Sequence, residues 1–203
     1  MNEPVRERVV LNVGCGRLHA SSLPVCFDGW KEIRVDNEAS VQPDVIADIA
    51  DLSAFADASA DAVWAAHCME HLYEYQISTA LSEFRRVLRD DGFVCVIVPD
   101  LQTVASYIAQ DRLHEPLYRS AAGPITAHDI LFGFGPAIAA GQTTMAHHCG
   151  FTPAVLQRCF NGLRYGEVIV RRRSGSLELA AVARATAARS PSERAALMAS
   201  LQL

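Results

Sequence analysis

The chain lacks the sequence features that mark secreted, membrane-spanning and nucleic-acid-binding proteins. Its 203 residues carry a formal net charge of -5, which argues against a general nucleic-acid binder with a basic face. None of the six cysteines stands in a C-x-x-C pair, so we expect buried, reduced thiols and a cytoplasmic protein. The first residues hold no apolar core of signal-peptide length, and no apolar stretch of about 18 residues is free of charges and turn formers. We therefore expect no leader and no membrane span.

Glycine motifs that cradle phosphates are also missing. Gly14 and Gly16 follow an apolar run, but the third glycine of the dinucleotide fingerprint is replaced by His19, and there is no G-x-x-x-x-G-K sequence. The turn therefore suits a ligand without a pyrophosphate. The only basic run, Arg171 to Arg173, fits a solvated strand end better than a phosphate site.

What is present indicates one α/β domain over residues 1–203, since half of the residues are hydrophobic and apolar runs alternate with helical patterns. The expected parallel strands are Val9–Val13, Glu32–Asp36, Asp44–Asp48, Ala62–Ala66 and Phe93–Val98, and the expected closing hairpin is Gly166–Arg173 with Leu177–Arg184. The expected helices are Tyr75–Arg89, Leu101–Asp111, a helix from Thr152 to about Asn161, and Ser190–Leu201. This order predicts a doubly wound, mostly parallel, Rossmann-like sheet with a C-terminal antiparallel hairpin.

Residues 112–150 differ from their surroundings, because glycines and prolines interrupt any long element there. The stretch holds four of the seven histidines: His114, His128, His147 and His148. We interpret it as an insertion over the site, a lid for substrate, and residues 190–203 as a terminal tail.

The chemistry-bearing residues stand where expected strands end, which is where open α/β sheets bind ligands. The turn Gly14-Cys15-Gly16 lets the backbone approach a ligand closely. Asp36 ends the second strand, where a carboxylate accepts ribose hydroxyls, although a helix N-cap is the alternative. Asp48 ends the third strand and could accept an adenine amino group beside the Ile49 amide, or form a turn.

His67, Glu70 and His71 form an H-x-x-E-H sequence, which is also found in a class of zinc peptidases. On one helix, two histidines four residues apart could share a metal ion. Here Asp61 to Ala66 predicts a strand, so His67 stands at a strand end, and no third ligand is evident. We therefore expect no metal site, and we keep a zinc hydrolase as a remote alternative.

Together these segments resemble the class I S-adenosylmethionine-dependent methyltransferases, in their type-11 branch. The shared pieces are GCG, a strand-ending Asp36, Asp48 before LSAF, Met69-Glu70-His71-Leu72 and RVLRDDG. The Val98-Pro99-Asp100 segment and His147-x-x-Gly150-Phe151-Thr152 are similar to a small bacterial group of predicted methyltransferases. The resemblance covers the run from Val9 to Arg184. Ser53-Ala54 and Asp91 depart from the usual Leu-Pro and Gly, at positions that contact no ligand.

The resemblance implies S-adenosyl-L-methionine as cofactor and S-adenosyl-L-homocysteine as product. The implied cofactor-binding residues are Asn12, Gly14, Cys15, Gly16, Asp36, Asn37, Asp48, Ile49, Ala66 and His67. A general base is needed only for an acceptor of high pKa. The candidates are Asp100, at the end of the fifth strand, His147, where the insertion rejoins the fold, His71 and His128. A structural or substrate-orienting role stays open for each.

Several acceptor classes are disfavoured. The fourth strand is followed by AHCMEH rather than the Asn/Asp-Pro-Pro-Tyr/Phe of enzymes that methylate DNA bases, and no pair of glutamates suggests arginine methylation. A small-molecule, lipid or glycan acceptor remains, and the resemblance favours a glycan hydroxyl. The alternative is a non-catalytic protein that binds adenosylmethionine or a partner on the same fold. The oligomeric state, a homodimer included, stays open.

Overall fold

The computed structural model describes residues 6–17, 23–173, 175–188 and 190–203, so His19 and the first five residues lie outside it. Seven strands form one sheet in the order β3-β2-β1-β4-β5-β9-β8. The five parallel strands are β1 (Val9–Val13), β2 (Lys31–Asp36), β3 (Val45–Ile46), β4 (Ala60–Ala66) and β5 (Leu88–Pro99), and the antiparallel pair is β8 (Glu167–Arg172) with β9 (Glu178–Arg184). The predicted sheet and its closing hairpin are confirmed.

One face of the sheet packs against α1 (Glu74–Val87) and α5 (Pro153–Cys159). The strands are apolar at nearly every position because both faces are covered, as parallel strands require. In α1, Ile77, Leu81 and Phe84 lie on one side at helical spacing and are fully or nearly buried. The 3-10 turn η3 (Met69–His71) joins β4 to this helix and adds Met69 to the same core.

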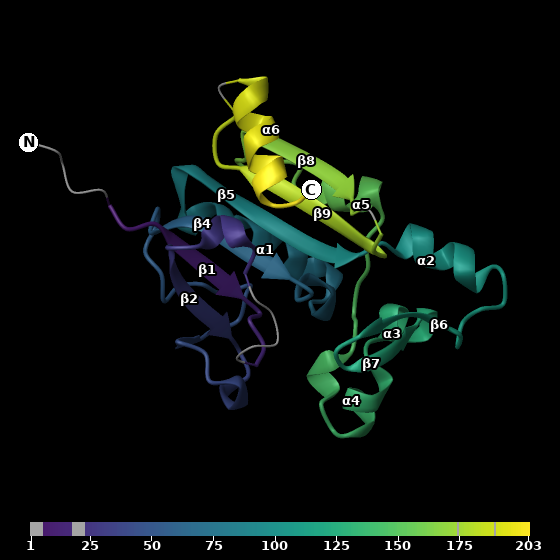
Figure 1. Ribbon diagram of the computed structural model, residues 1–203. Helices are drawn as coiled ribbons and strands as arrows, with labels where there is room; N and C mark the ends of the chain where they lie inside the picture. Colours follow the sequence, from purple (N-terminus) through teal and green to yellow (C-terminus); the bar gives the residue numbers. More distant parts are fainter. Residues whose placement is uncertain (1–5, 18–22, 174, 189) are drawn as a thin grey trace, which may run out of the picture.

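The opposite face is covered by residues from the two ends of the chain. Among the described residues that follow β1 is the 3-10 turn η1 (Val25–Phe27), and Phe27 contacts Trp30, Trp64 and Phe93 through its ring. The terminal helix α6 (Pro191–Ser200), which was predicted and is drawn in yellow in Figure 1, adds Leu197 to this cluster. The C-terminal helix thus covers sheet area that the short η1 turn leaves open.

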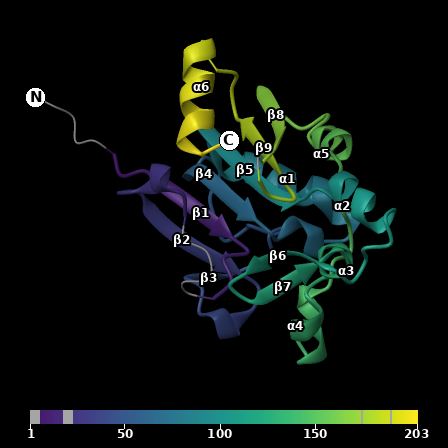
Figure 2. The same cartoon turned by 45° about the vertical axis from the view of Figure 1, so that its right-hand side comes forward.

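The insertion lies between α2 (Leu101–Ile108) and α5, beyond the carboxyl ends of the parallel strands in both views (Figures 1 and 2). It consists of the hairpin β6 (Pro116–Ser120) and β7 (Gly123–Thr126), the helices α3 (Ala127–Phe132) and α4 (Gly135–Ala139), and the 3-10 turn η4 (Thr143–Met145). Its elements are short, as the glycines and prolines predicted. They share an apolar cluster with α2, in which Val104 packs with Ile125 and Ile130. That the insertion acts as a lid stays a prediction.

In the part of the chain that the structure describes, the longest helix is α1, with 14 residues. It runs directly into β5 at Leu88, although a stop was predicted at Asp90-Asp91-Gly92. The pairing of β4 with β5 shifts register between Ala60 and Ala62, which accommodates those residues within an irregular strand. Among the described residues, no helix combines the length and apolar character needed to cross a membrane.

Candidate active site

Two glycines in left-handed conformation shape the turn after β1. Gly14 has φ of +62° and Gly16 has φ of +60°. A Cβ added to Gly14 would lie 2.4 Å from the Cβ of Cys68, whereas one added to Gly16 would meet no described atom within 4 Å. Gly14 is therefore required by the packing of the turn against the chain after β4. Gly16 leaves its backbone open to a ligand.

Asp36 holds this turn in place from the end of β2. Its carboxylate accepts hydrogen bonds from the backbone N–H of Gly16 and of Glu38, both at 2.9 Å. The N-cap alternative for Asp36 is wrong for the nearest turn, η2 (Ala39–Val41), because Glu38 caps it by accepting from the N–H of Ser40. Each carboxylate oxygen can accept two hydrogen bonds, so Asp36 keeps capacity for a ligand hydroxyl.

The remaining predicted cofactor residues fall into two groups. Asp48 accepts from the Ala50 N–H at 2.8 Å in a turn at the same edge, beside the buried Ile49. Asn12 lies within β1, nearly buried, and donates to Glu32 at 2.7 Å. The side chain of Asn12 thus links β1 to β2 through this hydrogen bond, which favours a structural role over the predicted ligand contact. The others are placed at the edge: Cys15 is buried in the glycine turn, Asn37 is exposed after β2, and Ala66 is half-buried at the end of β4.

His67 follows β4 with φ of +53°, a conformation that is rare outside glycine and clusters at functional sites. Its Nε2 lies 2.9 Å from the carboxylate of Glu178, and its Nδ1 lies 3.5 Å from that of Glu70. Burial opposes the charged imidazolium, but the hydrogen bonds to Glu178 and Glu70 outweigh it and raise the pKa of His67 to about 10. His67 is therefore a cation held between two carboxylates at neutral pH.

Glu178, at the start of β9, joins this cation to the arginine run. Burial raises the pKa of a carboxyl group, but His67 and Arg173 outweigh it and lower the pKa of Glu178 to about 2. Arg173 donates to Glu178 at 2.6 Å, and Arg172 donates to Asp100 at 2.7 Å. Two of the three arginines are thus ion-paired, which corrects the expectation of a merely solvated strand end.

This ion pair predicts a pH window. Because the pKa of His67 in the folded protein lies above its ordinary value of 6.5, its contribution to stability is complete below that value and is lost as the pH rises through about 10. Because the pKa of Glu178 lies below 4.5, its contribution is complete above that value and is lost as the pH falls through about 2. We expect the His67 ring, followed by NMR, to stay protonated from roughly pH 5 to 8.5.

Two matched variants separate the effect of the His67–Glu178 ion pair from general charge effects. Glu178→Gln should move the titration of His67 downward, since it removes the nearest carboxylate. Glu115→Gln, at an exposed glutamate paired with Arg112 in the insertion, should leave it unchanged. A His67 ring that titrates near pH 6.5 in the unmodified protein would contradict the ion pair.

His71 and His147, both predicted as candidate bases, are brought together. Their ring centroids lie 4.9 Å apart at an interplanar angle of 70°. Both line a cavity of about 150 Å³ between the strand ends and the insertion, whose other walls include His67, Glu70, Tyr118 and Ile130. Burial lowers the pKa of His147, so its imidazole is neutral near pH 7. A neutral imidazole facing a cavity can accept a proton or bind a metal ion.

The chain after the insertion is tied to the turn that carries His71. The N–H of His148 donates to the backbone oxygen of Glu70 at 2.9 Å, and His71 Nδ1 lies 3.0 Å from the oxygen of Ala146. Nothing in the local sequence predicts this pairing, because the partners are more than 70 residues apart. The hydrogen bonds fix the position of His147 relative to His71.

Asp100 occupies a different environment from the one predicted for a base. It is the N-cap of α2, where its carboxylate accepts from the N–H groups of Gln102 and Thr103 and from the Thr103 hydroxyl. With Arg172 as a fourth donor and 2 % of its surface exposed, its oxygens are well occupied. This arrangement favours a structural role. His128 packs between His114 and Phe132 in the insertion.

The arrangement needed for an H-x-x-E-H zinc hydrolase is not formed. That site places both histidines on one helix. Here His67 stands at the end of β4, while Glu70 and His71 belong to the 3-10 turn η3. The imidazole of His67 is engaged by two carboxylates rather than turned toward His71 as a second ligand.

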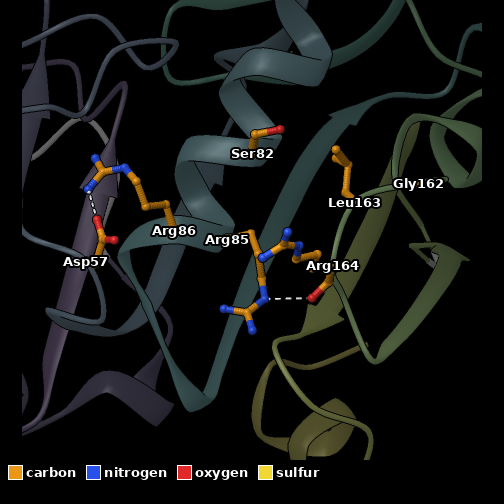
Figure 3. A pocket seen from close by; sticks show the side chains of 7 residues that line it. All are labelled: Asp57, Ser82, Arg85, Arg86, Gly162, Leu163 and Arg164. Atoms are coloured by element: carbon orange, nitrogen blue, oxygen red, sulfur yellow. Dashed lines mark hydrogen bonds and ion pairs between the residues drawn. The ribbon is translucent and has the colours of Figure 1, made fainter.

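A larger cavity, of about 450 Å³, lies at the opposite edge of the sheet. Its wall comes from residues that precede β4, β5 and β8, among them Asp57, Arg85, Arg86 and Arg164. Figure 3 shows Arg86 paired with Asp57 at 2.8 Å and Arg85 donating to the backbone oxygen of Arg164 at 2.7 Å. Ligands of parallel α/β sheets bind beyond the carboxyl ends instead, so these arginines serve as clamps between elements.

Comparisons with known proteins relate the chain to methyltransferases. Residues 11–96 match the family model described as a methyltransferase domain. Comparison with curated protein sequences gives no significant match. A methyltransferase structure from Methanosarcina mazei described as SAM-dependent is 15 % identical, with 90 % of this chain and 95 % of that chain covered and a TM-score of 0.57. A SAM-dependent methyltransferase from Archaeoglobus fulgidus is 16 % identical, with 87 % and 86 % covered and a TM-score of 0.57.

A third structure, 1,6-didemethyltoxoflavin-N1-methyltransferase from Burkholderia thailandensis with bound 1,6-didemethyltoxoflavin and S-adenosylhomocysteine, is 18 % identical. It covers 90 % of this chain and 72 % of that chain at a TM-score of 0.50. At these identities the structural likeness establishes the fold alone. The chain has the α/β fold of SAM-dependent methyltransferases, and residues 11–96 match the methyltransferase domain model.

Proposed function

We propose that this chain transfers a methyl group from S-adenosylmethionine to a small molecule, or to the end of a glycan or lipid, in the cavity of His71 and His147. The observation that carries the proposal is the position of this cavity beside the glycine turn. Val13 of β1 pairs with Ala65 of β4, so the turn after β1 and His67 emerge next to each other at the same edge. A donor on the turn would therefore face an acceptor in the cavity.

The residues at this edge fit an adenosyl ligand. The open backbone at Gly16 can approach the amino-acid tail closely, and Asp36 has hydrogen-bonding capacity for two ribose hydroxyls. Asp48 and Ile49 would meet the adenine ring, and the backbone of Ala66 and His67 the methionine part. The cofactor supplies an electrophilic methyl group on its sulfonium, so the protein's task is alignment of the acceptor.

The cavity limits what the acceptor presents. Its volume of about 150 Å³ is below the roughly 300 Å³ at which drug-sized sites begin, so a single ring or one sugar unit enters. Histidines, Glu70 and Tyr118 among its walls favour a hydroxyl-bearing group. Of the candidate bases predicted from the sequence, His71 and His147 line this cavity, so we propose them as bases or as groups that orient the acceptor. A cytoplasmic location, a possible homodimer and the choice between glycan, lipid and free small molecule stay predictions.

The decisive experiment is titration calorimetry with S-adenosylmethionine and S-adenosylhomocysteine. It is followed by an assay that detects formation of S-adenosylhomocysteine from S-adenosylmethionine over a panel of hydroxyl acceptors. Micromolar binding with turnover on at least one acceptor would support the proposal. Tight binding without turnover over a broad panel would favour the non-catalytic alternative. A folded protein that binds neither compound would refute the cofactor site.

Asp36→Ala should weaken binding of either compound by about 1–3 kcal/mol, the loss expected for charge-assisted hydrogen bonds to ribose. The matched control is Glu38→Ala, which removes an exposed carboxylate two residues away that caps η2. The Glu38→Ala protein should bind the cofactor with the affinity of the unmodified protein. Equal dissociation constants for all three proteins, measured by calorimetry, would assign Asp36 to holding the Gly16 turn alone.

A further inference from the structure

Three potential metal ligands meet at the wall of the acceptor cavity. One ligand atom each from Glu70, His71 and His147 can be chosen so that all lie within 4.8 Å of one another. Glu70 and His71 come from η3, and His147 comes from the chain that leaves the insertion. The hydrogen bonds between these two segments hold the three side chains together in the structure as it stands.

Both imidazoles are fixed by a hydrogen-bond contact at Nδ1. His71 Nδ1 lies 3.0 Å from the oxygen of Ala146, and His147 Nδ1 lies 2.8 Å from the oxygen of Ile130. A backbone oxygen only accepts, so each Nδ1 carries a proton, and the neutral form of each imidazole then has its lone pair on Nε2. Metal-binding histidines almost always donate their other ring N–H to a carbonyl or carboxylate in this way.

Glu70 provides the independent observation. Its side chain is 2 % exposed, one oxygen faces His67, and Oε2 has no hydrogen-bond partner among the described residues. A buried carboxylate oxygen without a partner is costly, and such a group calls for a ligand. The oxygen that lacks a partner belongs to the same carboxylate that stands beside two imidazoles with available lone pairs.

We propose that Glu70, His71 and His147 bind a divalent first-row metal ion, with Zn²⁺ as the best match to two imidazoles and one carboxylate. Three atoms within 4.8 Å of one another can all lie within about 2.8 Å of a central ion. Zinc–nitrogen distances are about 2.0–2.1 Å, so each ligand has to move inward by less than about 1 Å. The sequence predicted no metal because His147 is too far along the chain to be recognised as the third ligand.

The site also deepens the proposed function, on which this part of the inference rests. A metal ion held by three protein ligands keeps open positions. Because all three residues line the cavity that would receive the acceptor, an acceptor oxygen could bind the ion there, and the ion would lower the pKa of that oxygen.

The test is titration of the chelator-stripped protein with Zn²⁺ by calorimetry, and with Co²⁺ by visible absorption, both without cofactor. We expect one equivalent to bind, with absorption bands of a low-coordinate Co²⁺ site. His147→Gln should weaken Zn²⁺ binding by about 100-fold or more, beyond the 10–100-fold typical of changes around the ligands. Glu70→Gln is the second variant, and circular dichroism establishes that each is folded.

The control is His114→Gln, at an exposed histidine of the same insertion, which should bind Zn²⁺ as the unmodified protein does. Equal affinity of the unmodified, His147→Gln and Glu70→Gln proteins would overturn the proposal, as would the absence of stoichiometric binding. A parallel titration with S-adenosylhomocysteine separates the two proposals. Cofactor binding without metal binding would refute the metal site alone, and metal binding without cofactor binding would refute the proposed function alone.

Discussion

Gly14→Ala is expected to destabilise the protein by about 2–5 kcal/mol and to abolish cofactor binding. Two costs combine: left-handed backbone costs a residue with a Cβ roughly 1–2 kcal/mol, and overpacking a core typically costs 1–3 kcal/mol. The overpacking arises because the new Cβ would lie 2.4 Å from the Cβ of Cys68, itself buried. The turn has to shift, and with it the N–H of Gly16 that Asp36 holds. Urea denaturation and calorimetry with S-adenosylhomocysteine measure both effects.

The position of Cys68 allows a specific rescue. Cys68→Gly removes the opposing Cβ and should recover part of the lost stability in the double variant. Cys68→Ala retains that atom and removes only the Sγ, which lies 3.2 Å from the added Cβ, so it should recover less. Gly16→Ala is the companion variant. It carries the left-handed cost without a described neighbour, so it should lose about 1–2 kcal/mol. A Gly14→Ala protein as stable as Gly16→Ala would show that the contact with Cys68 does not constrain the turn.

The sheet was predictable because its strands carry their own signal. β1 is apolar at four of its five positions and ends at glycines, and the observed bounds Val9–Val13 are those predicted. Strands buried on both faces need apolar residues throughout, so sequence composition alone identifies them. β3 was predicted at Asp44–Asp48 but pairs only over Val45–Ile46, since an edge strand with one neighbour makes few ladder bonds.

The hairpin β6–β7 was not predicted because its residues are mostly exposed. Gly123 and Pro124 suggested a broken loop, and the residues of β6 do not alternate between buried and exposed. The strands are held by pairing with each other and by Ile125, which joins the cluster on α2. Such a hairpin depends on tertiary contacts that local sequence does not encode.

The site was predictable in its residues but not in its partnerships. His71 and His147 were candidates from their positions at segment ends, and the structure places their rings in contact. His67 was expected to bind the cofactor, and its imidazole is also an ion-pair partner of Glu178, 111 residues away. Residue type and spacing identify which groups can do chemistry. Which of them meet is decided by the path of the insertion over the sheet.

Asp100→Ala is expected to destabilise the protein by about 2–4 kcal/mol, because it removes the cap of α2, typically worth about 1 kcal/mol, and leaves Arg172 without its carboxylate. Asp100→Asn retains an amide oxygen that can cap the helix, so it should lose less. If the role of Asp100 is structural, the Asp100→Asn protein should transfer methyl groups at nearly the rate of the unmodified protein under conditions in which it is folded. A general base would behave differently, since neither variant could accept the proton and both would lose about 10²–10⁴ in rate. Rates measured well below each variant's melting temperature therefore decide between the observed capping geometry and the catalytic role predicted from the strand end.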